Sequence, residues 1–282
     1  MTWRIATRHV STYRYAGPVV ASYNEARLTP SSDGRQLVLD AAITVTPAAH
    51  VFRYLDYWAS VVHAFEVQED HEELVVVATS LVETGLQRDA AGESQTTWEL
   101  LAAPQVRDRY AELLAPTDYA PFDAELAAEA RAATVGATPA EAVEQVATLL
   151  RSTMSYEPGS TEVSTSASEA WQQRSGVCQD FAHLTLSMLR QLGVPARYVS
   201  GYLHPLEEAP AGEPITGASH AWIEAWLGSF QPIDPTNGAR VAERHVTVAR
   251  GRDYADVPPL RGVYHGGELR ELSVAVELTR VA

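Results

Sequence analysis

The period of the hydrophobic pattern changes once along this chain, and that change constrains the fold more than any other feature. From residue 3 to about residue 84, apolar and polar residues alternate, with clear runs at 37–45 and 61–67. Alternation with period two is typical of β-strands that bury one face. Turn-forming residues divide this region, namely Pro18, Pro30, Gly34 and Pro47. We therefore predict an N-terminal antiparallel β-sandwich domain of short strands.

A helical period replaces the alternation between about residues 106 and 155. Thr138, Pro139 and Glu141 provide an N-cap, a first-turn proline and a capping-box acid, which together predict a helix over 139–154. Its apolar residues fall on one face and are expected to form a buried stripe of Val143, Val146, Ala147, Leu150 and Met154.

A Ser/Thr/Gly-rich loop over 157–168 precedes a second helix, which begins at Cys178 and is stopped by Gly193 and Pro195. One stripe of this helix is expected to be buried: Phe181, Leu184, Thr185, Met188, Leu189 and Leu192. Strand-like runs follow at 197–203, 219–227 and 231–233. A helix packed on an antiparallel sheet makes the fold class α+β. We predict two closely packed domains, a β domain over 1–105, with 85–105 as its exit, and a core over 106–282.

The composition narrows the chemistry. The 282 residues carry a formal charge of −15 without a basic cluster, which argues against nucleic acid as a partner. All 21 basic residues are arginine, so a lysine Schiff base and a Ser-Lys dyad are excluded. No run reaches the ~18 apolar residues of a membrane helix and no signal peptide is recognisable, so we expect no membrane partner and a cytoplasmic location.

Cys178 is the single cysteine of the chain. It cannot form an internal disulfide or a multi-thiolate zinc site, so its reactivity is the best reason to single it out. At a helix N-terminus a thiol faces unpaired N–H groups and the positive end of the helix dipole, both of which stabilise a thiolate. The sequence thus predicts Cys178 as a nucleophile.

His220 is the candidate base. It begins a run in which His220, Trp222, Glu224 and Trp226 share one strand face. Asp234 follows 14 residues later and is expected to accept the Nδ1 proton of His220 and to orient the ring. Gly228 and Ser229 set a turn whose register misses direct pairing of the two residues by about three positions. We therefore expect a bulge or strong strand coiling to bring them together.

Four motifs carry a family resemblance: Gly176-Val177-Cys178-Gln179-Asp180-Phe181-Ala182-His183, the 193–202 segment, Ser219-His220-Ala221-Trp222, and Asp234-Pro235-Thr236-Asn237-Gly238. Together they resemble the bacterial transglutaminase-like cysteine enzymes, and the resemblance extends to the N-terminal β region and to 251–259. It implies a papain-like core with Cys178 as nucleophile, His220 as base and Asp234 as orienting residue. One departure is Asp56-Tyr57-Trp58-Ala59-Ser60, where family members often have Gly and Asn in a turn.

Other residues near these motifs receive weaker assignments. Tyr156 lies where the family places an aromatic residue, and its hydroxyl could bind an oxyanion beside the Cys178 N–H. Gln172 is a rival donor by analogy with papain-like enzymes, and Trp222 could contact substrate. We interpret His183 as structural and Asp180 as a stabiliser of the helix start. A last group either borders the cleft or pairs within its own loop: Arg252, Asp253 and Asp256.

Three functions remain open at this stage. The favoured one is a cysteine peptidase or amidase that forms a thioester on a peptide or protein amide substrate and releases it to water. The second is a transglutaminase that transfers the acyl group to an amine, and the third is a non-catalytic protein-binding scaffold. No histidine spacing typical of zinc is present, and neither calcium nor a nucleotide is supported, so we expect no metal and no cofactor.

Overall fold

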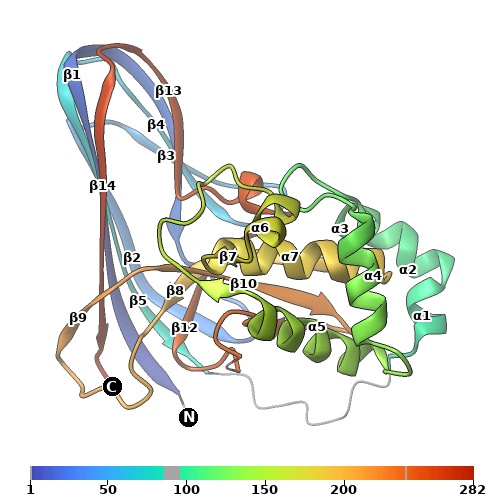
Figure 1. Ribbon diagram of the computed structural model, residues 1–282. Coiled ribbons are helices and arrows are strands. Elements are labelled where there is room, and N and C mark those ends of the chain that lie inside the picture. Colours follow the sequence, from blue (N-terminus) through green and yellow to red (C-terminus); the bar gives the residue numbers. More distant parts are fainter. Residues whose placement is uncertain (1, 86–95, 239) are drawn as a thin grey trace.

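The computed structural model describes residues 2–85, 96–238 and 240–282. A long twisted antiparallel sheet lies beside a smaller sheet covered by helices (Figure 1). This arrangement confirms the predicted α+β class, with an N-terminal antiparallel sheet and a separate helical region.

Strand β1 (Trp3–Thr29) organises the large sheet. Its first half pairs with β5 and β14, and its second half pairs with β4 and β13. The sheet has eight strands, and the other seven are β2 (Gln36–Thr46), β3 (Val51–Leu55), β4 (Val61–Val67), β5 (His71–Thr84), β9 (Pro214–Gly217), β13 (Leu260–Gly266) and β14 (Leu269–Arg280). The sequence analysis expected Pro18 to end a strand, but it lies inside β1. The pairing of β1 with β5 is interrupted between Arg14 and Val19, and its pairing with β14 ends at Tyr15, so this position tolerates a missing N–H.

The C-terminal strands β13 and β14 belong to this sheet, although they fall in the segment assigned to the core by sequence. The first and last strands therefore lie side by side, and the Arg4 N–H donates to the Ala282 carbonyl. The boundary at residues 105 and 106 remains a prediction. Residues 86–95 of the expected exit segment lie outside the described residues.

The second body is a four-stranded sheet, β11-β10-β8-β12, against which the helices pack. Its strands are β8 (Ala196–Leu203), β10 (Ser219–Trp226), β11 (Phe230–Ile233) and β12 (His245–Gly251). A short parallel pair, β6 (Ser155–Tyr156) and β7 (Ser175–Gly176), completes the strands. The helices are α1 (Trp98–Ala102), α2 (Pro104–Arg109), α3 (Ala111–Leu114), α4 (Ala124–Ala133), α5 (Pro139–Thr153), α6 (Ala167–Gln173), α7 (Cys178–Gln191) and the 3-10 turn η1 (Tyr254–Asp256).

Helix α5 forms as the sequence predicts. Thr138 and Glu141 make the capping box, with the Glu141 Oε2 accepting the Thr138 N–H at 2.8 Å. Its stripe is buried, from Val143 to Met154. Because the capping groups and the apolar stripe are both local signals, this helix was identifiable without tertiary information.

The sequence predicted one buried stripe on helix α7, but the helix is buried on all sides over most of its length. Every residue from Asp180 to Arg190 is buried, because α7 contacts the sheet on one side and α3, α4, α5 and α6 on the others. Arg190 is 3% exposed, and its guanidinium donates to the carbonyls of Ala115, Ala196 and Arg252. The helix that carries the cysteine is thus the central element of the core.

The two alternating runs of the β region differ in the structure. In β4 the apolar face from Val61 to Val67 is buried, as predicted. In β2 the corresponding face is not, since Leu37 and Leu39 remain 45% and 44% exposed. Strand β2 lies at the edge of the sheet and has a neighbouring strand, β5, on one side only, so fewer side chains cover its residues.

The Asp56–Ser60 segment, whose sequence differs from that of many family members, forms a turn, as inferred. The Asp56 Oδ1 accepts the N–H groups of Trp58 and Ser60, and Ala59 adopts a left-handed φ of 62°. No helix in the described part of the chain has the length and hydropathy needed to cross a bilayer.

Candidate active site

Cys178 is the first residue of α7, immediately after the N-cap Val177. Asp180 fixes this helix start, because its Oδ2 accepts the Val177 N–H at 2.7 Å and the Thr161 hydroxyl at 2.7 Å. Burial raises the pKa of Asp180. The geometry supports the structural interpretation of Asp180. It leaves the Cys178 N–H among the helix-terminal donors that have no partner within the helix.

Gly176 allows the chain to enter α7 at this angle. A Cβ at this position would lie 2.7 Å from both Cβ and Oδ2 of Asp180, closer than real contacts allow. Gly176 also pairs with Tyr156 in the β6–β7 ladder, which anchors the segment before the cysteine. Close packing of Gly176 on Asp180 therefore sets the position of the thiol.

His220 is the second residue of β10, a strand that contacts α7. The β10–β11 register is regular, with Ile223 opposite Ile233, and continuing it by one residue places Asp234 opposite Trp222. Asp234 is then the diagonal neighbour of His220 on the same face, within reach of its side chain. The expected bulge is not present between β10 and β11, so this part of the sequence interpretation was wrong.

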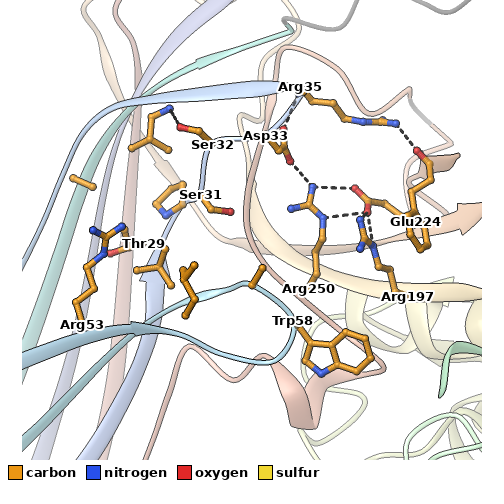
Figure 2. A pocket seen from close by; sticks show the side chains of 18 of the residues that line it. Thr29, Ser31, Ser32, Asp33, Arg35, Arg53, Trp58, Arg197, Glu224 and Arg250 are labelled. Carbon is orange, nitrogen blue, oxygen red and sulfur yellow. Dashed lines mark hydrogen bonds and ion pairs between the residues drawn. The ribbon is translucent and has the colours of Figure 1, made fainter. Parts of the chain in front are cut away.

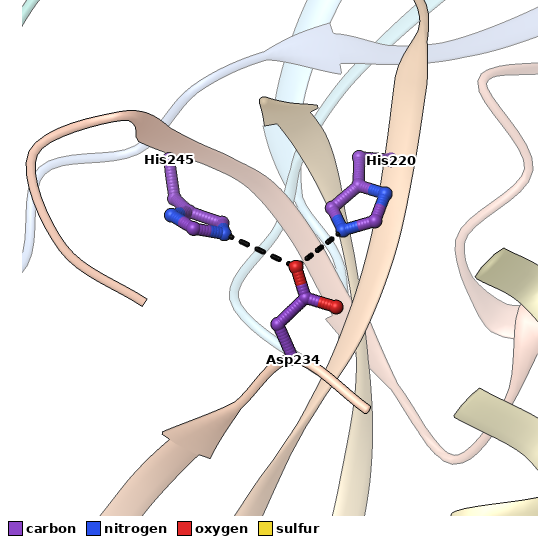
Figure 3. A group of neighbouring side chains, drawn as sticks. All are labelled: His220, Asp234 and His245. Atoms are coloured by element: carbon purple, nitrogen blue, oxygen red, sulfur yellow. Dashed lines mark hydrogen bonds and ion pairs between the residues drawn. The ribbon is translucent and has the colours of Figure 1, made fainter. Parts of the chain in front are cut away.

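The Asp234 carboxylate binds His220 directly, with 2.8 Å between its Oδ2 and His220 Nε2 (Figure 3). The contact is at Nε2, whereas the sequence analysis placed it at Nδ1. The same Oδ2 accepts the Asn237 side-chain amide at 2.9 Å, and Oδ1 accepts the N–H groups of Thr236 and Asn237. The carboxylate is thereby fixed in a turn that directly follows β11.

The charge state of this pair follows from its surroundings. Burial lowers the pKa of His220, but hydrogen bonds with Asp234 and with Cys178 outweigh it and raise that pKa to about 9. Burial raises the pKa of Asp234, yet the hydrogen bonds from His220, His245 and Asn237 hold it well below its usual range. Because Asp234 occupies Nε2, Nδ1 is the ring nitrogen left for Cys178. At neutral pH the site holds an imidazolium between a carboxylate and a sulfur atom.

His245 was not identified from the sequence. It lies on β12, is 4% exposed, and its Nε2 is 3.5 Å from Asp234 Oδ2. Its Nδ1 accepts the Ala242 N–H, which places the proton of the neutral ring on Nε2 and makes it a donor to the carboxylate. Burial lowers the pKa of His245 and keeps the ring neutral. The alternating run from His245 to Ala249 could have indicated a strand, but not its pairing with β8.

Trp222 packs behind the two histidines. Its ring lies edge-on to His245 at 5.3 Å and beside His220 at 6.0 Å, and it is 0% exposed. Gly201 of β8 makes room for it, since a Cβ there would lie 2.6 Å from the indole. This burial favours a supporting role for Trp222 over direct contact with a substrate.

The two proposed oxyanion donors lie in different environments. Tyr156 is 54% exposed. Burial is the largest cause that raises the pKa of its phenol, and the charges of Cys178 and Asp234 raise it further. The phenol is therefore a neighbour of the cysteine and the carboxylate. Gln172 is exposed on α6.

The contacts of the remaining candidates favour structural roles. His183 is fully buried, its Nε2 accepts the Tyr254 N–H at 3.2 Å, and burial lowers its pKa to about 3. Arg252 forms two hydrogen bonds with Asp256, and Asp253 caps η1. These contacts match the loop ion pair considered in the sequence analysis.

Among the described residues, His220, Asp234 and His245 place three potential metal-ligand atoms within 4.8 Å of one another. The hydrogen bonds described above already account for the orientation of all three side chains. We therefore interpret the group as a histidine–carboxylate–histidine network.

Comparisons with known proteins identify the family of both parts of the chain. Residues 5–83 match the bacterial transglutaminase-like N-terminal region, and residues 127–235 match the transglutaminase-like superfamily. The second range contains Cys178, His220 and Asp234, and ends before His245.

Similar proteins extend over almost the whole chain. An uncharacterized protein of Mycobacterium leprae, ML0607, is 45% identical over 280 residues, covering 99% of this chain and 100% of that protein. Rv2569c of Mycobacterium tuberculosis, also uncharacterized, is 34% identical over 309 residues, covering 98% and 93%. A crystal structure of a proposed cysteine protease from Cytophaga hutchinsonii has the same fold, with a TM-score of 0.78 at 22% identity over 99% of this chain and 98% of that chain. The chain therefore belongs to the transglutaminase-like superfamily and carries the bacterial N-terminal region of that family.

Proposed function

We propose that this protein is a cysteine peptidase or amidase that cleaves an amide bond through a thioester on Cys178. The observation that carries the proposal is the position of His220, whose ring bonds to the buried Asp234 at 2.8 Å on one side and to Cys178 on the other. This is the arrangement that nucleophilic catalysis by a thiol requires.

The reaction follows from the charges in the site. The Cys178 thiolate attacks the carbonyl carbon, and a bond forms between sulfur and carbon as the carbonyl oxygen becomes negative. The C–N bond then breaks, and His220 transfers its Nδ1 proton to the leaving amine. A water molecule next attacks the thioester while His220 takes one of its protons. Breaking the C–S bond releases a carboxylic acid and restores the Cys178 thiolate beside the protonated His220.

Two groups are placed to stabilise the oxyanion. The Cys178 N–H lies at the N-terminus of α7, where it adds to the positive end of the helix dipole. The half-exposed Tyr156 neighbours the same sulfur, which supports its hydroxyl as the second donor.

Alkylation of Cys178 tests the nucleophile. We expect iodoacetamide to label Cys178 stoichiometrically at neutral pH, faster than a free exposed thiol, and His220→Ala to lose this acceleration. His265→Ala, at an exposed histidine of β13, serves as the matched control and should label like the wild type. Labelling of the wild type no faster than a model thiol would remove the enzymatic proposal and favour a binding scaffold.

The same variants separate chemistry from folding. Cys178→Ala and His220→Ala are expected to abolish turnover of an amide substrate found by screening acyl probes. The thermal midpoint of Cys178→Ala should stay close to that of the wild type, because Cys178 lies outside the fully buried part of α7. His220→Ala should lower the midpoint at neutral pH but still fold, because it leaves the buried Asp234 carboxylate without its imidazolium partner. Unfolding of either variant would instead assign its side chain a structural role.

Water is proposed as the acyl acceptor. An amine must be bound in its neutral form beside the thioester, which requires a desolvated channel with polar acceptors. Trp222, an apolar candidate for the wall of such a channel, is 0% exposed and packs behind His220, so it offers no surface to an amine. Incubation with a labelled primary amine and a glutamine-containing protein decides between the acceptors. Amine incorporation that outruns deamidation and cleavage would favour a transglutaminase.

A further inference from the structure

A cavity of about 1050 Å³ lies between the large sheet and the core sheet, and its lining includes none of Cys178, His220 and Asp234. Its walls come from the segment between β1 and β2, from β2 and β3, and from the start of β11 (Figure 2). The volume is within the range of sites that bind small ligands or short peptide segments.

The charges of this cavity are not balanced. Four guanidinium groups line it, from Arg35, Arg53, Arg197 and Arg250, against the three carboxylates of Asp33, Asp40 and Glu224. Burial lowers the pKa of the only histidine in the lining, His63, so it adds no charge at neutral pH. In a chain with a formal charge of −15, a cavity with one excess cation is unusual.

The internal ion pairs involve only two of the four arginines, Arg197 and Arg250. Glu224 is 2% exposed and is shared by Arg197 and Arg250, at 2.7 Å and 3.1 Å, and Arg250 also binds Asp33 at 2.6 Å. The Arg35 guanidinium donates to the carbonyl of Phe230 at 2.6 Å. Among the described residues neither Arg35 nor Arg53 forms an ion pair, but Arg53 is exposed to solvent whereas Arg35 is partly buried in the cavity wall. A guanidinium has five N–H donors and matches a carboxylate with two parallel hydrogen bonds.

A second polar group in the cavity also lacks a partner. His63 is 8% exposed, and its Nδ1 makes no hydrogen bond with any described residue. Because this nitrogen is itself enclosed, it is an unsatisfied polar group within the wall of the cavity and is not exposed to an occupant.

The walls favour an extended chain as the occupant. Within the described residues, strand β2 is the last strand at one end of the large sheet and β3 pairs with β4 alone, so both present a free edge. Leu39 and Leu55 from these strands line the cavity and are 44% and 61% exposed. A free strand edge beside exposed apolar side chains is the surface to which a peptide adds as an extra strand.

We propose that this cavity binds an extended peptide along the edge of β2 and that a single carboxylate of the peptide pairs with Arg35. A monoanion fits because one cation is in excess, whereas a dianionic phosphate would meet repulsion from Asp33 and Glu224. The carboxylate can belong to an acidic side chain or to a C-terminus. The site does not depend on the function proposed for Cys178.

Peptide binding to the full-length Cys178→Ala chain tests the proposal without turnover. Three fluorescent peptides of alternating Thr and Val are compared by anisotropy: a blocked peptide with one central Glu, the same peptide with Gln, and the Gln peptide with a free C-terminus. At least one carboxylate peptide should bind about tenfold more tightly than the blocked Gln peptide, the usual gain from a charge-assisted pair. The better of the two identifies the source of the carboxylate.

Variants of Arg35 locate the contact. Arg35→Gln should abolish the preference, and Arg35→Lys should retain part of it because the charge remains. Arg8→Gln, which removes an exposed arginine paired with Glu277 on another face, should leave the preference unchanged. Arg35→Lys decides the outcome if Arg35→Gln does not fold, as judged by its thermal midpoint.

Methylation of alternate peptide amides tests the strand edge. Methyl groups on the amides that would face β2 should abolish binding, while methylation of the intervening amides should not. Equal affinity for all three peptides, or an unchanged preference in both Arg35 variants, would overturn the proposal. Because the probes bind without reacting, these results are separate from the alkylation of Cys178.

Discussion

Replacement of Asp234 by Asn should remove the charge that keeps His220 protonated. In the wild type, burial lowers the pKa of His220, and the contacts with Asp234 and Cys178 raise it to about 9. Burial is the largest of these effects and persists in the variant. The pKa of His220 should therefore fall to its ordinary value of about 6.5 or below.

The magnitude follows from these two values. At pH 7.5 a histidine with a pKa of 9 is about 97% protonated, and one with a pKa of 6.5 about 9% protonated, so the imidazolium population falls about tenfold. If the imidazolium holds the thiolate, the alkylation rate of Cys178 at this pH should fall by a similar factor. The loss should be incomplete, because an asparagine still orients the ring.

Stability should change with pH in a matching way. A pKa raised on folding contributes stability that is present below pH 6.5 and is lost as the pH rises through 9. We therefore compare the free energy of unfolding of the wild type with that of Asp234→Asn at two pH values. The advantage of the wild type should be about 3 kcal/mol larger at pH 6 than at pH 10. Urea unfolding followed by tryptophan fluorescence measures this difference.

Asp256→Asn is the matched control, because that carboxylate pairs with Arg252 and makes no contact with His220. It should leave the alkylation rate at pH 7.5 unchanged. The reasoning fails if Asp234→Asn alkylates at the wild-type rate, or if its loss of stability is the same at pH 6 and pH 10.

Three further substitutions test individual contacts. His245→Phe keeps the ring contact with Trp222 but removes a hydrogen-bond donor to Asp234. Alkylation of Cys178 should therefore slow by about tenfold at most, as expected for one long hydrogen bond to a charge. An unchanged rate would show that His245 contributes only packing. Ala59→Gly should raise the free energy of unfolding by up to about 1 kcal/mol by relieving a left-handed φ of 62°, and a decrease in urea unfolding would show that the turn is not strained. Gly176→Ala should destabilise by about 1–3 kcal/mol and slow alkylation, since its methyl group would overlap Asp180, and full retention of both would contradict the packing described for the helix start.

Local signals in the sequence account for the elements that the analysis located well. Thr138 and Glu141 mark the start of α5, and Gly193 marks the end of α7, because caps and stops depend on neighbouring residues alone. The turn at Asp56–Ser60 is local in the same sense. Cys178, His220 and Asp234 were also selected from the sequence, and the structure brings them together.

Non-local pairing explains the features that the sequence analysis missed. Pro18 was interpreted as a strand boundary, yet it lies where the pairing of β1 with β5 is interrupted, between Arg14 and Val19, and the strand continues. Strand β14 lies more than 240 residues from the part of β1 it pairs with, and no local pattern indicates that pairing. The exposed face of β2 follows from its place at the sheet edge, which alternation alone does not reveal.

The sequence by itself determined the chemical groups of the site and the helix start that presents the thiol, because motif, capping and hydrophobic period are properties of short segments. Tertiary structure alone decided that Asp234 reaches His220 diagonally at Nε2, that His245 arrives from β12 as a second donor, and that α7 is enclosed on all sides. These features depend on which strands pair and in what register. That choice is made by burial of the whole chain and not by any one segment of it.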